Sequence, residues 1–504
     1  MKNFDIVIVG AGSAGCIVTN QIINNTNLKV LLIEAGPSDN HPVIQIPLGY
    51  GMTFFHKKMN WNFYSEKQKK LNDREVYYPR GKVIGGSGSI NAMIYARGLK
   101  TDFENWNLNK SWSWENIKDT YEKIEVPIKG KSKKIPINKI PVNDVSNEHH
   151  SILKNYFNAA NDFHFQFNRQ LNSYIEDQVG NYNVNIINGF RASSAKIFLK
   201  PIKNHPNLTI LTNTEVLKLN YENRKISSLK IKHKKKIIVI KPNIGTILST
   251  GSIMTPYLLL KSGIGKAEEL RQYNIPVQFN SPHVGKNFQD HLGLDYLYKT
   301  HMPTLNDELG TWTGRIKTVL RYFYNRKGPL SLSLNQGGGY INWKSLDPYP
   351  NIQLYFNPLT YSVSYKNKRP LLKTDKFSGF IIGFNSCRPK SLGEVKLRLE
   401  NEEYYPSINP NYLSDERDIH DLYSAFDFVR KFSSNKHIKN IIKAPINIDP
   451  IKASDKELLD HFKSMATTIY HPCGTCRMSK DINSGVVSDK LKVHGVENLW
   501  IVDA

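Results

Sequence analysis

A histidine followed by a proline lies close to the C-terminal end of the chain, in residues 471–478, which read HPCGTCRM. Proline restricts the backbone, so the imidazole of His471 is held in a defined place, and imidazole changes protonation near neutral pH. A lone histidine often has a structural role, but this turn-rich setting favours acid–base chemistry. Cys473 and Cys476 form a CxxC pair, a motif of zinc and redox sites. The sequence has no second CxxC and no His-x3-His partner, so we expect no metal.

Three glycines near the N-terminus, Gly10, Gly12 and Gly15, have the spacing GxGxxG. In a strand-to-helix turn, the first glycine permits the tight turn, the second lets the backbone approach a pyrophosphate, and the third allows close helix packing. The phosphates then lie at the helix N-terminus. Glu34 stands about 20 residues further on, where an acid can accept hydrogen bonds from a ribose. This pattern predicts a dinucleotide site, for either FAD or NAD.

A second glycine-rich segment covers residues 78–98. So many small residues allow backbone amides to come close to a ligand and to stabilise an electron-rich ring or a phosphate. A flexible loop is the alternative. The apolar residues 90–95 favour the first interpretation, in which the segment wraps around the ligand.

The apolar pattern predicts the elements that must position these residues. Around the glycine turn, residues 4–9 and 29–36 predict strands and residues 16–25 predict a helix. Short apolar or alternating runs predict further strands at residues 208–211, 215–219, 245–251, 350–356 and 389–399. Helices are expected within residues 251–265 and at residues 415–431.

The 504 residues carry a formal net charge of +24. Lysines are scattered along the chain, with local concentrations at residues 131–134 and 232–236, and the second group is expected at the tip of a hairpin. We therefore expect no nucleic-acid partner, whereas contact with an anionic membrane surface stays open.

Four cysteines are too few for a disulfide framework in so long a chain, which indicates a reducing compartment. Lys2 and the apolar run after it imitate a signal peptide, but the glycine spacing explains these residues better. The sequence has no apolar run of about 18 residues or more, so no transmembrane helix is expected. We predict a cytoplasmic protein, with association at the inner face of the membrane as an open alternative.

Together, residues 4–36, 78–98, 251–265 and 470–478 resemble the glucose-methanol-choline (GMC) family of FAD-dependent oxidoreductases, and the resemblance runs from Phe4 to Ala504. It implies FAD as the cofactor and an α/β fold, with a Rossmann-like FAD-binding domain and a second α+β substrate domain built on an antiparallel sheet. The expected FAD-binding domain is discontinuous. It comprises residues 1–100, 190–285 and 455–504, and residues 101–189 and 286–454 form the substrate-binding domain.

The resemblance also implies the residues that contact FAD. Ser13 and Ala14 meet the pyrophosphate, Glu34 the adenosine ribose and Val216 the adenine. The full set is Gly10, Gly12, Ser13, Ala14, Gly15, Glu34, Ala35, Val83, Asn91, Ala92, Met93, Ile94, Val216, Asp503 and Ala504. Where a family member attaches FAD covalently through a histidine, one place before the asparagine, this chain has Ile90. We therefore expect non-covalent binding.

The implied reaction is oxidation of a primary alcohol to an aldehyde, with His471 as the base and flavin N5 as the hydride acceptor. Tyr470 and Gln336 are the expected substrate residues. Choline-oxidising relatives carry a glutamate at the place of Gln336, so a neutral alcohol becomes more plausible here than choline. The partners are a small-molecule alcohol and an electron acceptor other than NAD, either a quinone or oxygen.

Relatives continue past the Asp–Ala pair to a second histidine or asparagine and a last helix, whereas this sequence ends at Ala504. We therefore expect reduced or no activity from this chain. Two alternatives to the oxidoreductase stay open: a non-redox lyase similar to the hydroxynitrile lyases that share the fold, and a truncated flavin-binding protein of low activity.

Overall fold

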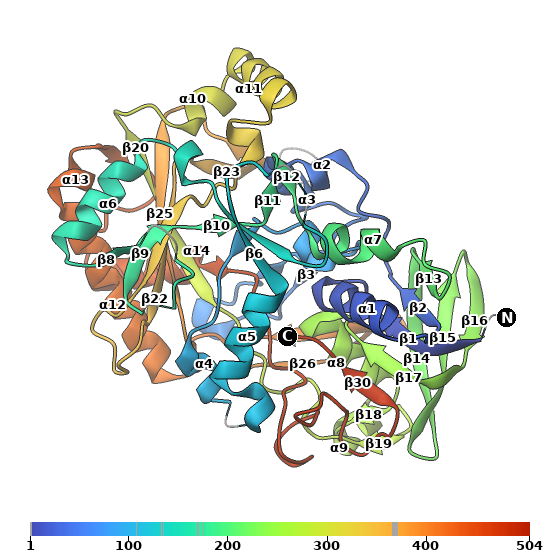
Figure 1. The fold of residues 1–504 in the computed structure, drawn as a ribbon. Coiled ribbons are helices and arrows are strands. Elements are labelled where there is room, and N and C mark those ends of the chain that lie inside the picture. The colour runs from blue at the N-terminus through green and yellow to red at the C-terminus, as the bar shows by residue number, and fades with distance from the viewer. Residues whose placement is uncertain are drawn as a thin grey trace.

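The computed structural model describes residues 3–106, 108–132, 134, 136–168, 171–174, 176–364 and 371–504, and two sheets dominate its fold (Figure 1). The first has five strands, paired in parallel throughout, in the order β13–β2–β1–β17–β30. In that order the strands are Leu208–Leu211, Val30–Ile33, Phe4–Val9, Pro242–Leu248 and Leu499–Ile501. The sheet thus joins the beginning, the middle and the end of the chain, while the domain boundaries given above stay predictions.

The glycine turn connects β1 to helix α1, Ser13–Asn25, and α1 leads into β2. The strands and the helix therefore lie where the sequence predicts them. Strand β2 is buried along its whole length, as expected for a central strand of a parallel sheet that is covered on both faces.

A three-stranded meander follows β13 and is formed by β14, β15 and β16. Its strands are Thr214–Glu222, Lys225–His233 and Lys236–Ile240. Lys234 and Lys235 both have positive φ, so the lysine group at residues 232–236 surrounds the tip of a hairpin, as predicted. Helix α8, Gly251–Lys261, comes after β17, and Gly263 with φ +85° ends it.

The second sheet has eight strands in the order β28–β20–β25–β22–β21–β9–β8, with β29 also paired to β20. Its pairings are antiparallel except between β8 and β9. In that order, followed by β29, the strands are Ile442–Pro445, Leu292–Thr300, Gly379–Ser386, Ile352–Asn357, Gly337–Ile341, Gln178–Asn181, Gln166–Asn168 and Thr467–Thr468. The expected antiparallel sheet is confirmed.

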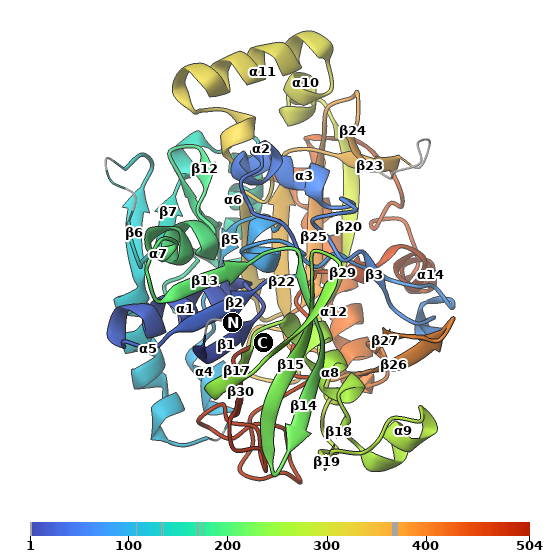
Figure 2. The ribbon, with the colours of Figure 1, turned by 90° about the vertical axis from the view of Figure 1, so that its right-hand side faces the viewer.

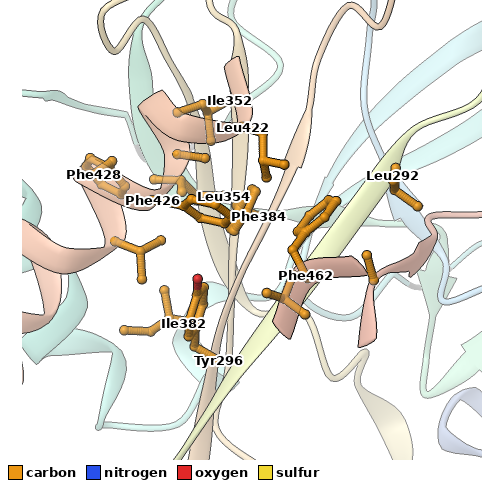
Figure 3. Packing of buried hydrophobic residues seen from close by; sticks show 14 of the residues in the cluster. Leu292, Tyr296, Ile352, Leu354, Ile382, Phe384, Leu422, Phe426, Phe428 and Phe462 are labelled. Atoms are coloured by element: carbon orange, nitrogen blue, oxygen red, sulfur yellow. The ribbon is translucent and has the colours of Figure 1, made fainter. Parts of the chain in front are cut away.

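Helices cover one face of this second sheet and form the largest core with it (Figure 3). Leu422 and Phe426 of α12, Glu416–Ser434, pack with Phe462 of α14, Asp455–Met465, against Phe384 of β25. Helix α6, Leu153–Asp162, contributes to the same core. Because successive side chains of a strand point to opposite faces, the other face of the sheet is free to carry different chemistry.

Strand β20 shows this division clearly. Leu292, Leu294, Tyr296 and Tyr298 are buried in the helix-covered core. The alternate positions 291, 293 and 295 therefore belong to the opposite face, on which the candidate site is built.

Two helices, α10, Leu305–Leu309, and α11, Trp312–Asn325, project together at one end of the molecule (Figure 2). Other short elements connect the sheets or extend them. They include α2 (Pro42–Gln45), α3 (Tyr50–Thr53), α4 (Lys100–Glu104), α5 (Trp114–Ile124), β6 (Glu125–Lys129), β7 (Ile140–Asp144), α9 (Ala267–Gln272), β26 (Glu394–Glu400), β27 (Glu403–Asn409) and α13 (Lys436–Lys439). Within the described residues, no helix combines the length and the apolar character needed to cross a membrane.

Candidate active site

The three glycines of the first turn meet different surroundings. A Cβ at Gly10 would lie 2.3 Å from the carbonyl oxygen of Ser249, and one at Gly15 would lie 2.0 Å from the carbonyl oxygen of Gly10. These two glycines are required by the packing of the protein itself. A Cβ at Gly12 would have its nearest protein neighbour at 3.8 Å. The space beside Gly12 is therefore left for a ligand, as the dinucleotide pattern requires.

The second glycine-rich segment, residues 78–98, lies directly against this turn. The N–H of Gly85 donates a hydrogen bond to the carbonyl of Ala11 at 2.6 Å. Gly86 has φ +56°, and a Cβ there would lie 2.8 Å from the Cα of Gly12. The two glycine segments, far apart in the sequence, thus form one cradle.

The N-terminus of α1 is open for an anion. Among the described residues no side chain caps it at Gly12, and its first turn has no acidic residue. A Cβ at Gly88 would lie 2.8 Å from Oγ of Ser13, so the cradle leaves little space over that hydroxyl. The amides of Ser13 and Ala14 at this helix end fit a pyrophosphate.

Glu34 follows β2 and is buried. Its Oε2 accepts a hydrogen bond from the N–H of Ala11 at 2.9 Å, and its Oε1 accepts one from the N–H of Gly36 at 2.9 Å. Burial raises the pKa of Glu34 to about 7. Ala35 follows Glu34 in the chain. The N–H of Thr214, the first residue of β14, donates a hydrogen bond to the carbonyl of Glu34 at 2.9 Å. The half-buried Val216 lies two residues further along β14. This surrounding fits the adenosine half of FAD.

Val83 and Ile90 pack together with Ile44 and Met59 in a small apolar cluster. Both side chains are buried, and Ile90 has no group that could form a bond to a flavin. The strip that the resemblance assigns to the flavin, Val83 and residues 91–94, is therefore supported by apolar side chains.

Asn91 begins the exposed part of this strip. Its Oδ1 accepts hydrogen bonds from the N–H of Met93 at 3.0 Å and from Nη1 of Arg191 at 2.7 Å. Met93 has φ +61°, and Ala92 and Ile94 on either side are half-buried. Burial lowers the pKa of Arg191 to about 9, and its Nη2 has no hydrogen-bond partner among the described residues. Arg191 fixes the strip, although no sequence motif identified it.

The segment around His471 pairs with residues 287–291, a polar group that the sequence shows without a role. The N–H of Gln289 donates to the carbonyl of Cys473 at 3.0 Å, and the N–H of Cys473 donates back at 2.9 Å. The N–H of Ile469 donates to the carbonyl of His291 at 3.0 Å. The turn that bears His471 is therefore fixed on both sides to the start of β20.

Asp290 is the centre of this attachment. Its Oδ1 accepts the backbone N–H of His471 at 2.9 Å. Its Oδ2 accepts hydrogen bonds from the hydroxyls of Tyr412, at 2.6 Å, and Thr468. Asp290 is buried, and each of these hydrogen bonds satisfies an oxygen of its carboxyl group.

The His471 ring lies across the ring of His291, with centroids 5.6 Å apart and an interplanar angle of 86°. Nδ1 of His291 is 2.6 Å from the carbonyl oxygen of Ser386, so this nitrogen is the donor. The Arg80 guanidinium donates to the carbonyl of Tyr470 at 2.7 Å. The surrounding protein, and then His291 and Arg80, lower the pKa of His471 below its usual value. Because the ring is open to water, solvent weakens the shift but keeps its direction.

An acidic side chain, Asp295, lies on the same face of β20 as His291. On the neighbouring strand a Cβ at Gly383 would lie 2.6 Å from Oδ1 of Asp295 and 1.8 Å from the ring of Tyr355. The side chain of Tyr355 hydrogen-bonds to Asp295, and burial raises the pKa of Asp295 to about 6. Burial, and then the charge of Asp295, raise the pKa of Tyr361. Burial also raises the pKa of Tyr470, and the charge of Asp295 acts in the same direction. All four side chains keep part of their surface exposed.

Gln336 lies elsewhere on the second sheet, just before β21. Its Oε1 accepts the N–H of His150 at 2.8 Å, and its side chain is buried. The contacts that the structure describes for Gln336 do not include Tyr470 or His471. Its part in substrate recognition stays a prediction, whereas the charge of Asp295 on the site face acts on Tyr470.

The C-terminal pair lies against helix α8. Oδ2 of Asp503 accepts hydrogen bonds from the N–H of Gly251 and, at 2.8 Å, from the hydroxyl of Thr255. Burial raises the pKa of Asp503. Ala504 is exposed beside it. The N-terminal end of α8 therefore holds Asp503 and Ala504 beside β30, the edge strand of the parallel sheet.

The CxxC pair consists of Cys473 and Cys476. Both cysteines are free, and burial raises the pKa of Cys473 to about 11. Within the described ranges, no group of three or more histidine, cysteine or acidic side chains could hold a metal ion.

Sequence reasoning missed several residues of this site, among them Arg80, Arg191, Asp290 and Asp295. Asp290 belongs to a visible polar cluster, and Asp295 is an acid inside an alternating apolar strand, which is itself a signal. Arg80 lies within the second glycine segment. Arg191 offers no signal, because only the fold shows that it is buried against Asn91.

The cradle on the parallel sheet and the histidine mounted on the antiparallel sheet together define a two-part flavin-dependent oxidoreductase. Sequence models of the GMC oxidoreductase family match residues 4–293 and 389–504. The chain belongs to the GMC oxidoreductase family, and FAD is its cofactor. The resemblance seen in the sequence is thereby confirmed.

Relatives of known activity cover almost the whole chain. The alcohol dehydrogenase [acceptor] of Pseudomonas putida is 34% identical over 508 residues, which span 99% of this chain and 91% of that protein. Mitochondrial choline dehydrogenase of Mus musculus is 28% identical over 520 residues, which span 99% and 85% of the two chains. The crystal structure of pyridoxine 4-oxidase from Mesorbium loti superposes with a TM-score of 0.85 at 25% identity, covering 100% of this chain and 94% of the other.

Proposed function

We propose that this protein oxidises the CH–OH group of a primary alcohol to an aldehyde and passes the electrons to an acceptor other than NAD, a quinone or oxygen. The observation that carries the proposal is the mounting of His471. Its backbone is fixed by Asp290, while the residue remains exposed to solvent. A base for an alcohol must be held in this way, because proton transfer requires hydrogen-bonding distance and a fixed direction.

His471 acts on the hydroxyl proton. Its lowered pKa keeps the imidazole neutral at physiological pH, so the ring can accept that proton as the C–H bond breaks. FAD, when bound, supplies the hydride acceptor. Arg80 and His291 disfavour the charged ring before the reaction, which leaves the base ready. The residues of the cradle, from Gly10 to Glu34 and from Val83 to Ile94, hold the cofactor.

The same geometry favours a choline-like alcohol as a substrate. Asp295 presents a negative charge on the site face, and Tyr355 and Tyr470 place aromatic rings beside it. A carboxylate with aromatic neighbours attracts a quaternary ammonium group through charge and cation–π interactions. Asp295 therefore offers the attraction that Gln336, a neutral amide, lacks. Neutral alcohols remain substrates in this proposal, with higher KM values.

We also propose that FAD is bound without a covalent link. The side chain at the position of covalent attachment is Ile90, which packs with Val83 and Met59. Acid precipitation of the purified protein should release all of the flavin into the supernatant. Flavin that remains with the precipitate would contradict this proposal.

The test of the proposed reaction is anaerobic bleaching of the bound flavin by a panel of alcohols. Choline and 3,3-dimethylbutan-1-ol form the matched pair, because they have the same shape and differ in charge. We expect both to reduce the flavin, with choline effective at lower concentration, and reoxidation by quinone or by oxygen then identifies the acceptor. If no alcohol bleaches the flavin, and cyanohydrins release cyanide instead, the chain is a lyase and the proposal is wrong.

A further inference from the structure

Helix α11 exposes a continuous apolar stripe to solvent. Trp312, Leu320 and Phe323 are 75%, 64% and 63% exposed, which is unusual for side chains of this size. The complete stripe consists of Trp312, Ile316, Val319, Leu320, Phe323 and Tyr324. With 3.6 residues per turn, these six positions fall within one arc of about 140°. The stripe is therefore one face of the helix and not a set of scattered exposures.

The opposite face holds α11 on the protein. Thr318 and Tyr322 are buried, and the hydroxyl of Tyr322 donates a hydrogen bond to the carbonyl of Gly189 at 2.8 Å. Arg326 ends the helix in the left-handed conformation, with its guanidinium 4.8 Å from the ring of Phe190. The apolar stripe is thus presented outward by a helix whose orientation is fixed.

Basic side chains border the stripe on both sides. Lys317 and Arg321 lie along one border and Arg315 along the other, as the helical period requires. Arg326 and Lys327 follow at the C-terminal end, and residues 312–327 contain no Asp or Glu. Figures 1 and 2 show α11 beside α10 at one end of the molecule.

We propose that α11 is an interfacial helix that docks the protein on an anionic lipid bilayer. A fixed helix with Trp, Phe and Leu on one face and Lys and Arg along its borders is suited to lie in the headgroup region, with the apolar face inserted. The basic border attracts anionic headgroups, and this adds to the overall charge of +24. Docking would bring the protein to a membrane-dissolved electron acceptor.

A second copy of this chain is the rival occupant of the stripe. Pairing two α11 helices face to face would place the basic borders of both helices together, with no acidic residue on either helix to offset them. Charge complementarity therefore favours the anionic membrane. The inference rests on α11 alone and holds whether or not the proposed alcohol oxidation is correct.

The test is co-sedimentation of the FAD-loaded protein with vesicles. The wild type should bind vesicles of phosphatidylglycerol and phosphatidylcholine, and bind pure phosphatidylcholine vesicles at least about tenfold more weakly, because the basic border responds to charge. In Leu320→Glu/Phe323→Glu, binding to both compositions should fall by at least about tenfold, because two charged groups enter the apolar face. In Lys317→Glu/Arg321→Glu, the preference for anionic vesicles should disappear.

The matched control is Ile237→Glu/Leu346→Glu, which changes two apolar residues that are exposed to a similar extent, 60% and 66%, outside α11. It should bind vesicles as the wild type does. The inference is overturned if the wild type does not bind anionic vesicles, or if Leu320→Glu/Phe323→Glu binds them unchanged. It is also overturned if that variant changes a dimer into a monomer by light scattering while vesicle binding stays the same.

Discussion

The carboxylate of Asp290 accepts the backbone N–H of His471 at 2.9 Å, although 181 positions separate the two residues. This bond does not involve the imidazole ring. It sets the place from which the ring extends, and the Asp290 carboxylate is in turn fixed by Tyr412 and Thr468. The candidate base therefore depends on a buried network that lies behind it.

Asp290→Asn should slow flavin reduction by about 10- to 100-fold while FAD remains bound, because a small displacement of a reacting group has a large effect on rate. The amide can accept from His471, but its NH2 group meets two hydroxyl donors in place of an acceptor. Stopped-flow reduction, normalised to bound FAD, measures this loss.

The control for that variant is Asp418→Asn. Asp418 is also buried and accepts the N–H groups of Lys390 and Ser391, and within the described residues no hydrogen bond joins it to His471. It should lower the melting temperature without changing the rate per bound flavin. An equal loss of rate in both variants would show that Asp290 supports the fold in general and not the position of His471.

Two glycines of the first turn provide a matched pair for the cofactor site. Gly12→Ala should leave the stability of the apoprotein nearly unchanged, because the nearest protein atom to the new Cβ is 3.8 Å away. It should weaken FAD binding by at least about tenfold, since the methyl group occupies the approach to the pyrophosphate. Gly10→Ala should destabilise the apoprotein itself, because its Cβ would lie 2.3 Å from the Ser249 carbonyl. Flavin titration and thermal unfolding separate the two effects, and normal FAD affinity in Gly12→Ala would contradict the placement.

Asp295→Asn should change which alcohol is preferred. The KM for choline should rise by about tenfold or more, whereas the KM for 3,3-dimethylbutan-1-ol should change little, because only the cation loses an attraction. The pH dependence has a defined sign. The pKa of Asp295 is raised to about 6, so the wild type should lose its preference for choline as the pH falls through that value and the carboxyl becomes neutral. If the ratio of the KM values for choline and 3,3-dimethylbutan-1-ol is unchanged in the variant, Asp295 does not take part in recognising the cation.

The rate of flavin reduction should depend on pH through His471. The imidazole acts as a base only when neutral, and its pKa lies below the usual value of 6.5. With a neutral alcohol, the rate should therefore be constant above pH 6.5 and should fall only at lower pH, as the ring becomes protonated. If the rate of flavin reduction already falls near pH 8, the pKa of His471 lies above 6.5, which would contradict the lowered pKa.

The sequence predicted the parts of the protein whose local pattern determines their structure. The GxGxxG turn needs its glycines for close backbone contacts, so its strand, helix and acid could be placed to within a few residues. The hairpin tip at Lys234 and Lys235 was predicted for a similar reason, since charged residues between apolar runs cannot be buried.

The rest depends on contacts between distant segments. Nothing local indicates that Asp290 supports His471, that Arg191 holds Asn91, or that Asp295 and Tyr470 face the same space. The position of Asp295 follows from the register of β20 with β25, which pairs Asp295 with Gly383. The exposed stripe of α11 was also beyond sequence reasoning, because an amphipathic pattern does not say which face the protein covers.

The most direct test of the central claim is anaerobic flavin reduction by an alcohol in the wild type and in His471→Ala. Within the described part of the chain, no hydrogen bond joins His471 to Gly12 or Glu34 of the cradle, so the variant should bind FAD with the same stoichiometry and spectrum. Its rate of flavin reduction should fall by about 10²- to 10⁴-fold, the usual contribution of a general base. Bleaching at the wild-type rate in a fully loaded His471→Ala variant would contradict the role of His471 and, with it, the proposed mechanism.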